Sequence, residues 1–355
     1  MTQFSVKIYA LGCIKGFKGV AVKKNLTRKD IAEAAGVSPS TVSRALAGSE
    51  LLPRSTIERI SEIARDMGYH PNVLAKRLAT NRSFQIGFAV PSVLPGKGTF
   101  RTMYFSNILD AVVKEAFSRG YGVSIYPYEL ENDSFITLKT GKHVDGFVFA
   151  GLKKDSGLPL ALASENIPFV IIGSQYKELN VPSVNCEPLP GITEMLEALA
   201  ERHVKRLFFV HGDMDYYDAS EQKKALLKVT KSSAVKLAGV LNGNYSRSSG
   251  YEAAAALSTK LKTGDCVFLA NDRMAMGFYR YCYEHGIQIP LDVSVIGSDN
   301  DDNAYGLFPE LSTIEQPRTQ MGQAAVSMLI DILEKKKVKT ENIKIPEKFL
   351  IKKSI

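Results

Sequence analysis

The sequence predicts a small all-α module followed by a larger domain of two α/β lobes with parallel sheets. The N-terminal part places apolar residues at helical spacing between capping signals, whereas β-branched and aromatic runs alternate with helical patterns after about residue 84. Residues 1–83 hold 14 lysines and arginines against 6 acidic residues, and the remaining 272 residues hold 31 of each. The whole net charge of +8 therefore lies in the small module, which indicates that this module binds a polyanion.

Length and composition narrow the class of protein. A chain of 355 residues with 45% hydrophobic residues is long enough for two or three compact domains, so we expect a soluble globular protein. No run of about 18 apolar residues is present, and the early stretch IYALGCIKGFKG is too short and lysine-interrupted for a secretory signal. We therefore expect a cytoplasmic protein without a membrane span.

The sequence contains no recognisable catalytic, metal or cofactor motif. The four cysteines form no C-x-x-C pair, so we expect free, mostly buried thiols. The five histidines are dispersed, and neither a phosphate-cradling G-x-x-x-x-G-K-[ST] loop nor a G-x-S-x-G elbow occurs. We therefore expect a protein that is not an enzyme.

Two helices are predicted in the first part of the basic module. The segment TRKD at 27–30 is a capping-box pattern with Asp in place of Glu, and the helix that follows stops at Gly36, with an apolar stripe of Ile31, Ala34 and Ala35. Ser38 is a natural N-cap and Pro39 a natural first-turn residue for a second helix that runs to about Ala47. Its inward positions are Val42, Ala45 and Leu46.

A third helix, roughly Arg54 to Met67, closes the module and ends at Gly68. We expect it to bury Ile57, Ile60, Ile63 and Ala64. Two short helices joined by a glycine-containing turn, with a third closing the core, match a helix-turn-helix. An ordinary small helical bundle would show the same periodicity, and the charge asymmetry favours DNA binding.

The outward face of the second helix carries short hydroxyls and one arginine. We expect Ser38 to cap the helix, Thr41 and Ser43 to contact phosphates, and Ser40 and Arg44 to contact base edges in the major groove. Pro39 offers only apolar contact, for example to a thymine methyl group.

The segment LTRKDIAEAAGVSPSTVSRALAGS, followed by GYHPNVLAKRLAT, resembles the N-terminal module of the LacI/GalR family of bacterial transcriptional regulators. The resemblance implies that residues 71–79 form a hinge helix, which orders on the operator as an antiparallel pair in the minor groove. Leu78 matches the leucine that wedges between central base pairs. The positive charges of Lys76 and Arg77 favour binding in the minor groove, which is lined by phosphates. It also implies DNA contacts by Thr27, Asn72 and Ala75.

The larger domain offers seven candidate strands and several polar strand ends. The strands are FQIGFAV, GVSIYPY, DGFVFAG, FVIIG, RLFFVHG, DCVFLAN and VSVIGSD. Doubly wound parallel sheets bind ligands outside the carboxyl ends of their strands. Three strands end in polar pairs or turns, at 212–213, 271–272 and 298–299.

The segments VPSVNCE, SSGYEAAAAL, FLANDRMAMG, IPLDVSVIGSD and LSTIEQP extend the resemblance to the family's regulatory domain, which is similar to periplasmic sugar-binding proteins. Coverage is then nearly the whole chain from residue 26. The resemblance implies that two lobes close over a small effector, commonly a sugar, a sugar phosphate or a nucleobase. Asn271 and Asp299 match frequent ligands to hydroxyl groups, which suits a sugar or polyol. For Asp299 a structural role at the strand end is the alternative, and we favour the ligand role because Asp272 is available for structure.

The effector cleft also departs from the family pattern. Where many members have A-R-x-R-x-x-G, this chain has ASEQKKA, with Gln222 at the second arginine position. TMYF replaces an N-P-F-F segment, and Glu187-Pro188 replaces D-N. A strongly anionic effector is therefore disfavoured, because the arginine side chain that would bind it is missing, unless Lys223 or Lys224 takes its place. Tyr104 and Phe105 either stack on a sugar face or pack against the opening helix.

We predict an extension over 1–25, a helix-turn-helix domain over 26–70, a hinge helix and linker over 71–83, and an effector-binding and dimerisation domain over 84–355. The extension is interpreted as a misassigned start or a disordered arm. The first lobe is expected to span about 84–202 and 316–338, and the second about 203–315 and 339–355. The segment NIKIPEKFLIKKSI predicts a last strand and carries no leucine heptad for tetramer formation.

The function predicted from the sequence is a homodimeric, nucleoid-associated DNA-binding regulator, a repressor, controlled by a small effector. A two-fold dimer implies a near-palindromic operator. One alternative keeps DNA binding but makes the cleft vestigial, with control by a partner protein. Another, a solute-binding protein, conflicts with the missing export signal.

Overall fold

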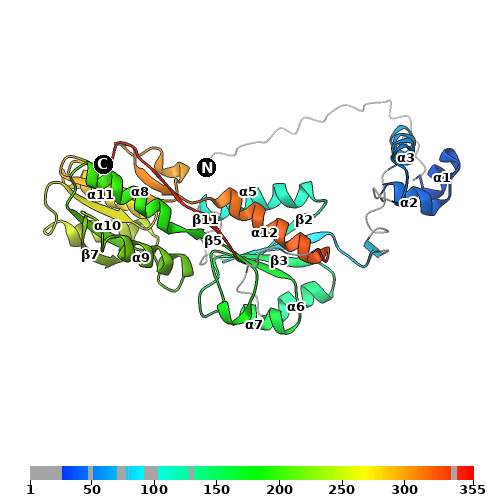
Figure 1. The fold of residues 1–355 in the computed structure, drawn as a ribbon, viewed down its shortest axis with the longest axis horizontal. Helices are drawn as coiled ribbons and strands as arrows, with labels where there is room; N and C mark the ends of the chain where they lie inside the picture. The colour runs from blue at the N-terminus through cyan, green and yellow to red at the C-terminus, as the bar shows by residue number, and fades with distance from the viewer. Residues whose placement is uncertain are drawn as a thin grey trace, which may run out of the picture. The chain divides into compact units, whose positions relative to one another are not determined.

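The computed structural model describes two compact units of the chain, Met1–Asn81 and Arg82–Ile355 (Figure 1). The residues described are 26–46, 51–69, 77–78, 80–91, 103–127, 132–336 and 342–355. Our predictions for the 1–25 extension and for Asn72, Ala75 and Lys76 lie outside these residues, as does most of the predicted hinge helix. None of the helices in the described part of the chain combines the length and apolar character that a bilayer crossing requires.

The N-terminal unit contains the three predicted helices, α1 (Arg28–Ala35), α2 (Pro39–Leu46) and α3 (Arg54–Asp66). Their core is formed by Ile31, Ala32, Ala35, Val42, Ala45, Ile60, Ala64 and Tyr69. The apolar stripe of α1 differs from the prediction, because Ala32 is buried where we expected Ala34, which is exposed. Positions 31, 32 and 35 lie on one face of the helix, so the buried face is rotated slightly from the one that we predicted.

The ends of α1 and α2 form as the sequence predicts. The Thr27 backbone N–H donates to the Asp30 carboxylate at 2.6 Å, and the Thr27 hydroxyl donates to the same oxygen at 2.7 Å. Gly36 ends α1 with a φ of 64°, a conformation that favours glycine. The Ser38 hydroxyl accepts the backbone N–H of Thr41 at 3.1 Å, which confirms Ser38 as the N-cap of α2.

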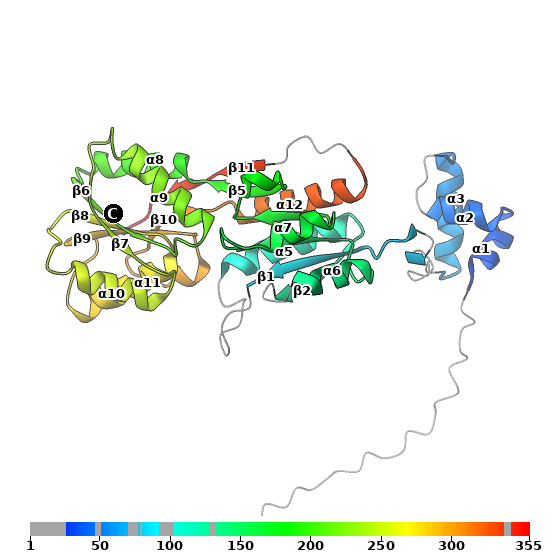
Figure 2. The same ribbon diagram turned by 90° about the horizontal axis from the view of Figure 1, so that it is seen from below.

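The larger unit is built on two six-stranded sheets, one in each lobe (Figure 2). The first has the order β11-β5-β4-β3-β1-β2 and the second β12-β10-β9-β8-β6-β7. All pairs are parallel except β10 with β12. The strands are β1 (Gln85–Val90), β2 (Gly122–Pro127), β3 (Gly146–Ala150), β4 (Phe169–Ile172), β5 (Ser183–Glu187), β6 (Arg206–His211), β7 (Lys236–Asn242), β8 (Asp265–Leu269), β9 (Val293–Ser298), β10 (Ser312–Glu315), β11 (Asn342–Pro346) and β12 (Lys348–Leu350).

Helices cover both sheets. The first lobe contains α5 (Met103–Ser118), α6 (Asn132–Thr140), α7 (Leu158–Ser164) and α12 (Arg318–Leu333). The second contains α8 (Pro188–Glu201), α9 (Tyr217–Val229), α10 (Arg247–Leu257) and α11 (Asp272–Glu284). Short 3₁₀ turns occupy Lys177–Leu179 and Asp302–Ala304. Cys186, Cys266 and Cys282 are buried free thiols, as expected for these three.

All seven candidate strands are confirmed, and the final segment differs from its prediction. It forms two short strands: β11 pairs with β5 in the first sheet, and β12 pairs with β10 in the second. Three strands, β5, β7 and β10, had no counterpart among the seven candidates. In β7 the sequence KLAGVLN contains a glycine, which weakens the signal of a strand.

The lobe boundaries also require correction. Residues 188–201 were expected in the first lobe, but α8 buries Ile192, Met195 and Leu199 in the core of the second sheet. Residues 342–346 were expected in the second lobe, but β11 belongs to the first sheet. The chain therefore crosses between the lobes at Glu187–Pro188, at Gln316–Pro317 and at Glu347, and we call these three places the crossovers. The last crossover is the red segment that runs between the lobes in Figure 1.

Glycines allow α10 and α11 to lie against each other closely. A Cβ atom on Gly277 would lie 1.9 Å from the Arg247 carbonyl oxygen. We predict that Gly277→Ala forces the helices apart and lowers the free energy of unfolding by about 1–3 kcal/mol, as measured by chemical denaturation. Gly157→Ala is the control, because nothing lies within 4 Å of its Cβ position. Equal stabilities of the two variants would contradict this account.

Candidate DNA-binding surface and effector site

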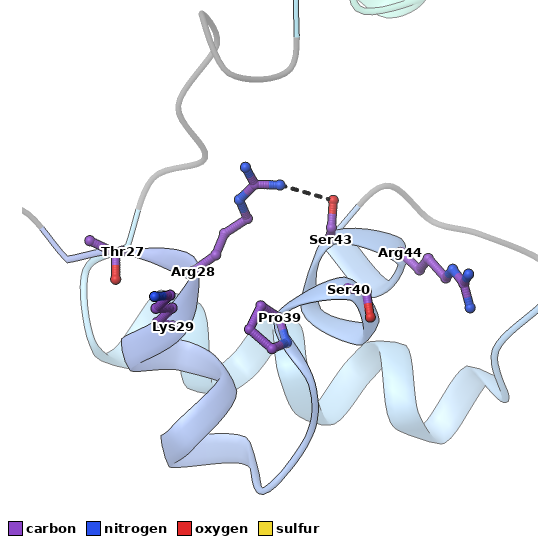
Figure 3. A pocket seen from close by; sticks show the side chains of 7 residues that line it. All are labelled: Thr27, Arg28, Lys29, Pro39, Ser40, Ser43 and Arg44. Atoms are coloured by element: carbon purple, nitrogen blue, oxygen red, sulfur yellow. Dashed lines mark hydrogen bonds between the residues drawn. The ribbon is translucent and has the colours of Figure 1, made fainter. Parts of the chain in front are cut away.

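A pocket of about 800 Å³ lies where the N-terminus of α1 meets the exposed side of α2 (Figure 3). Its lining residues are Thr27, Arg28, Lys29, Pro39, Ser40, Ser43 and Arg44. Five of these seven are residues that the sequence marks as DNA contacts. Arg28 and Lys29 were missed because the prediction assigned contacts chiefly to the second helix, although both belong to the basic first turn beside Thr27.

The cations of this surface have no carboxylate partner in the described part of the chain. The Arg28 guanidinium donates only to the Ser43 hydroxyl, at 3.4 Å, which links α1 to α2 (Figure 3). Lys29 and Arg44 are exposed and form no ion pair with a described residue. Three unneutralised cations beside exposed hydroxyls therefore provide a surface suited to a phosphate backbone.

Ser38 and Thr41 have a different position from the other hydroxyl residues. The Ser38 hydroxyl lies 2.7 Å from that of Ser40 and 2.9 Å from that of Thr41. Neither Ser38 nor Thr41 lines the pocket. Both therefore lie at the start of α2, outside the pocket. Thr27, Ser40 and Ser43 are the hydroxyl residues of the pocket lining, and the hydroxyls of Ser40 and Ser43 contact Ser38 and Arg28.

Leu78, the predicted minor-groove wedge, is 85% exposed. Its role on DNA stays a prediction.

The effector cleft brings together residues from both lobes. Tyr104 on α5 meets Asp218 on α9, with 3.5 Å between the hydroxyl and the carboxylate Oδ2. A Cβ on Gly173, whose φ is 75°, would lie 2.8 Å from that Oδ2 and 3.0 Å from the Tyr104 hydroxyl, so glycine is needed for this approach. The sequence does not mark Asp218, because its burial depends on contact between the two lobes.

Phe105 and Asn271 have structural surroundings. The Phe105 ring lies against Gly151, whose Cβ position is 2.9 Å from Phe105 Cζ. The Asn271 amide oxygen accepts the backbone N–H of Met274 at 2.9 Å, and its amide nitrogen donates to the Tyr245 carbonyl at 3.2 Å. Asn271 therefore caps α11, and packing is the better interpretation of Phe105.

The remaining candidates surround the cleft. The Gln222 amide, buried on α9, donates to the Ser298 hydroxyl at 3.5 Å. Glu187 is half-buried at the first crossover and precedes α8. Lys224 pairs with Glu221 at the surface, at 2.8 Å, and so does not supply the missing cationic fork.

Asp272 and Asp299 differ in their contacts. The Asp272 carboxylate accepts the backbone N–H of Asp301 and the hydroxyl of Thr313, both at 2.7 Å, which is a structural role. Asp299 follows β9 with a φ of 126°, and its carboxylate has no hydrogen-bond partner among the described residues. Its backbone carbonyl accepts from the buried Arg318 guanidinium.

Buried carboxyl groups dominate the electrostatics of this region. Burial, with the nearby Glu221 charge, raises the pKa of Asp218 to about 7 despite the hydrogen bond from Tyr104. Burial and the neighbouring Asp218 raise the pKa of Glu347 to about 8. Burial also raises the pKa of Asp299, which Arg318 partly opposes. The acidic character supports the expectation that a strongly anionic effector is disfavoured.

A second set of contacts joins the lobes. Lys153 of the first lobe forms an ion pair with Asp215 of the second at 2.9 Å, and the ammonium of Lys154 donates to the Ser220 hydroxyl at 2.9 Å. The lobes are therefore held together by the protein's own side chains.

Protein-family models match both parts of the chain. The model described as bacterial regulatory proteins, lacI family, matches residues 27–72, and a periplasmic binding protein-like domain matches residues 196–355. The relatives include the probable repressor ExuR of Bacillus subtilis, 26% identical over 93% of this chain and 98% of that protein. The repressor PurR of Proteus mirabilis is also 26% identical, over 93% and 96%.

Solved structures share the fold. The lac repressor dimer bound to operator and the anti-inducer ONPF superposes with a TM-score of 0.72 at 23% identity, covering 93% of this chain and 99% of that one. A complex of the regulator CelR with cellobiose has a TM-score of 0.70 at 23% identity and the same coverage. Residues 27–72 therefore carry a DNA-binding domain of the lacI type, and the chain is a DNA-binding transcriptional regulator.

The raised carboxyl pKa values predict a pH dependence of stability. A carboxyl group whose pKa is raised on folding does not lower the free energy of unfolding at a pH below its unfolded pKa, which is about 4. As the pH rises from that value to the folded pKa, the free energy of unfolding falls. With Asp218 at about 7 and Glu347 at about 8, the Tm of the ligand-free protein should fall between pH 5 and pH 8. Asp218→Asn should reduce this fall by several degrees, about 2–4 °C per kcal/mol.

Asp110→Asn is the control for this measurement, because Asp110 is an exposed residue paired with Lys114 on α5. Differential scanning calorimetry across the pH range gives both profiles. If Asp218→Asn keeps the wild-type slope, the carboxyl does not have the pKa assigned to it.

Proposed function

We propose that this regulator is a homodimeric repressor whose affinity for a near-palindromic operator is set by a small effector held between the lobes. The observation that carries this proposal is the pocket shared by α1 and α2, where Arg28, Lys29 and Arg44 lack carboxylate partners among the described residues. Since the partner is chromosomal DNA, the proposed location is the cytoplasm, on the nucleoid. The relatives named as repressors support this role rather than an enzymatic one.

The proposed contacts follow the geometry of the pocket. Ser40 and Arg44 read base edges, Pro39 offers apolar contact, and Thr27 with Ser43 contacts phosphates. Arg28 and Lys29 add phosphate contacts, while Ser38 and Thr41 hold the start of α2. Asn72, Ala75, Lys76 and Leu78 act in the proposed hinge helix.

The effector is proposed to be a sugar or polyol-like molecule. CelR, bound to cellobiose, and the lac repressor, bound to ONPF, share this fold. In this chain Tyr104, Gln222 and Asp299 are the candidates that face the cleft, with Glu187 at its edge, and Asp218 joins them.

An exposed apolar face supports the dimer. Val113 and Phe117 lie one turn apart on α5, and Ile125 lies on β2, the edge strand beside it. All three are exposed, Phe117 by 82%. Pairing of two such faces would remove this apolar surface from water and place two recognition helices on one operator.

The surface of α1 and α2 is tested by replacing Arg44. We expect Arg44→Ala to weaken binding to a duplex selected from random-sequence DNA by about 1–3 kcal/mol, roughly 5- to 150-fold. Arg54→Ala is the control, because Arg54 is 94% exposed and pairs with Glu58 outside the pocket. Fluorescence anisotropy over a salt series measures both. Unchanged, salt-dependent affinity in both Arg44→Ala and Leu78→Ala would reject the assigned roles.

The dimer is tested by placing a charge in the exposed face. Phe117→Glu should raise the dimer dissociation constant by about 100-fold, since central aromatic residues contribute 2 kcal/mol or more to an interface. Operator affinity should fall with it. Leu160→Glu, at an exposed leucine on α7, is the control. Sedimentation equilibrium measures the dimer dissociation constant of both variants. If Phe117→Glu remains as dimeric as wild type, the interface lies on another face.

A second candidate function keeps operator binding but assigns control to a partner protein. The direct contacts of Tyr104 with Asp218 and of Lys153 with Asp215 favour it, because they close the cleft without a ligand. Calorimetry against sugars, polyols and nucleosides separates the two. A panel with no binding, alongside intact operator binding, would favour the partner.

A further inference from the structure

The crossovers enclose a second pocket, of about 540 Å³. Gln316 and Pro317 of the second crossover and Glu347 of the last one line it, together with Arg318 and with Pro190 of α8, which follows the first crossover. The volume falls in the range of small-molecule sites, about 300–1,000 Å³. A molecule bound here would contact two of the three crossovers and the start of α8.

Three side-chain atoms of the residues that line this pocket have no hydrogen-bond partner in the described part of the chain. They are Glu347 Oε2, Arg318 Nη1 and Gln316 Oε1. Glu347 is 5% exposed and Arg318 4% exposed. The other guanidinium nitrogen, Nη2, already donates to the carbonyls of Asp299 and Asn300. Buried polar atoms without a partner are costly, so these atoms are arranged to receive one.

The charges around these atoms are unbalanced. Glu347, Asp218 and Asp299 are all buried, and the proximity of Asp218 and Asp299 raises the pKa of Glu347 further. Arg318 is the buried cation beside them, and the pocket lining also carries one further cation, Lys348, and two further carboxyl groups, Glu194 and Glu315. Charged groups of the second lobe act on Asp218 and Asp299 as well: Glu221 on α9, Asp272 and Arg273 on α11, and Asp301 after β9. Cys186 on β5, Tyr104 on α5 and Tyr245 after β7 are the neutral titratable groups nearby. Buried charges are normally paired, so the group that completes the cluster is a cation.

The geometry favours an organic cation over a metal ion. No group of three or more His, Cys, Asp or Glu side chains in the described residues converges as a metal site does. An ammonium group on a hydroxylated frame can donate to carboxylates that lie too far apart to share one ion. Its oxygens also supply the acceptor that Arg318 Nη1 lacks.

We propose that the effector is an amine-bearing sugar or polyol, whose ammonium group binds Glu347 in the pocket at the crossovers, where the charges of Asp218 and Asp299 also act on Glu347. Its hydroxyl or ring oxygen accepts from Arg318. This inference rests on the proposed effector function and names the chemistry of that site. Because the ammonium contacts the crossovers, binding would set the angle between the lobes.

Proton linkage follows from the same charges. An ammonium group favours the ionised carboxylates, so binding releases protons from Asp218 and Glu347, and affinity rises with pH above about 6 until the amine of the ligand loses its own proton. A neutral sugar has no such dependence on these carboxylates.

The experiment compares matched pairs on the full chain: D-glucosamine with D-glucose, D-galactosamine with D-galactose, and D-mannosamine with D-mannose. At pH 7.5 at least one amino sugar should raise the Tm and bind 10-fold or more tightly than its parent by calorimetry. Glu347→Gln should abolish this binding. Glu197→Gln, at an exposed position of α8, should retain it.

Operator binding by the same samples reports the proposed function separately. Parent sugars that bind as tightly as their amines, or intact operator binding with no response to any amine, would overturn the cation assignment. Ligand-free Glu347→Gln should be at least as stable as wild type, since it removes a buried carboxyl whose Oε2 has no hydrogen-bond partner among the described residues. If that variant fails to fold, Glu347 is structural, and Asp218→Asn with unchanged amine affinity would then reject the site.

Discussion

The buried guanidinium of Arg318 is the contact on which the two-lobe arrangement depends. It belongs to the first turn of α12, in the first lobe, and donates to the backbone carbonyls that follow β9 in the second lobe. This contact fixes the end of β9, and with it the left-handed backbone of Asp299. Arg318 therefore helps to set where Asp299 lies relative to the carboxyl groups of the first lobe, because it contacts both lobes.

The small unit shows how a short sequence divides its polar residues between folding and function. Ser38 and Thr41 use their hydroxyls to begin α2, whereas Ser40 and Ser43 keep theirs at the pocket with three cations. A hydroxyl engaged in a cap is fixed in direction and has less capacity left for a ligand. Some hydroxyls of this unit therefore stabilise the start of α2, and others line the pocket that a partner would contact.

Local signals in the sequence were sufficient for most of the fold but not for the cleft. Caps at Thr27 and Ser38 and the buried strand runs depend on near neighbours, so they could be predicted. The assignment of α8 and β11 to their lobes depends on long-range packing, which has no signal in a single segment. Asp218 and Glu347 were missed for the same reason, because their burial arises only when the lobes meet.

The last crossover has a consequence for the order in which the protein is made. β11 and β12 are edge strands of different sheets, and residues 342–350 add them one after the other. Neither lobe has its full sheet until these residues leave the ribosome, whereas α1, α2 and α3 form a separate core within the first 69 residues. The nascent chain can therefore complete the unit that carries the DNA-binding surface long before it completes the lobes that are proposed to control it.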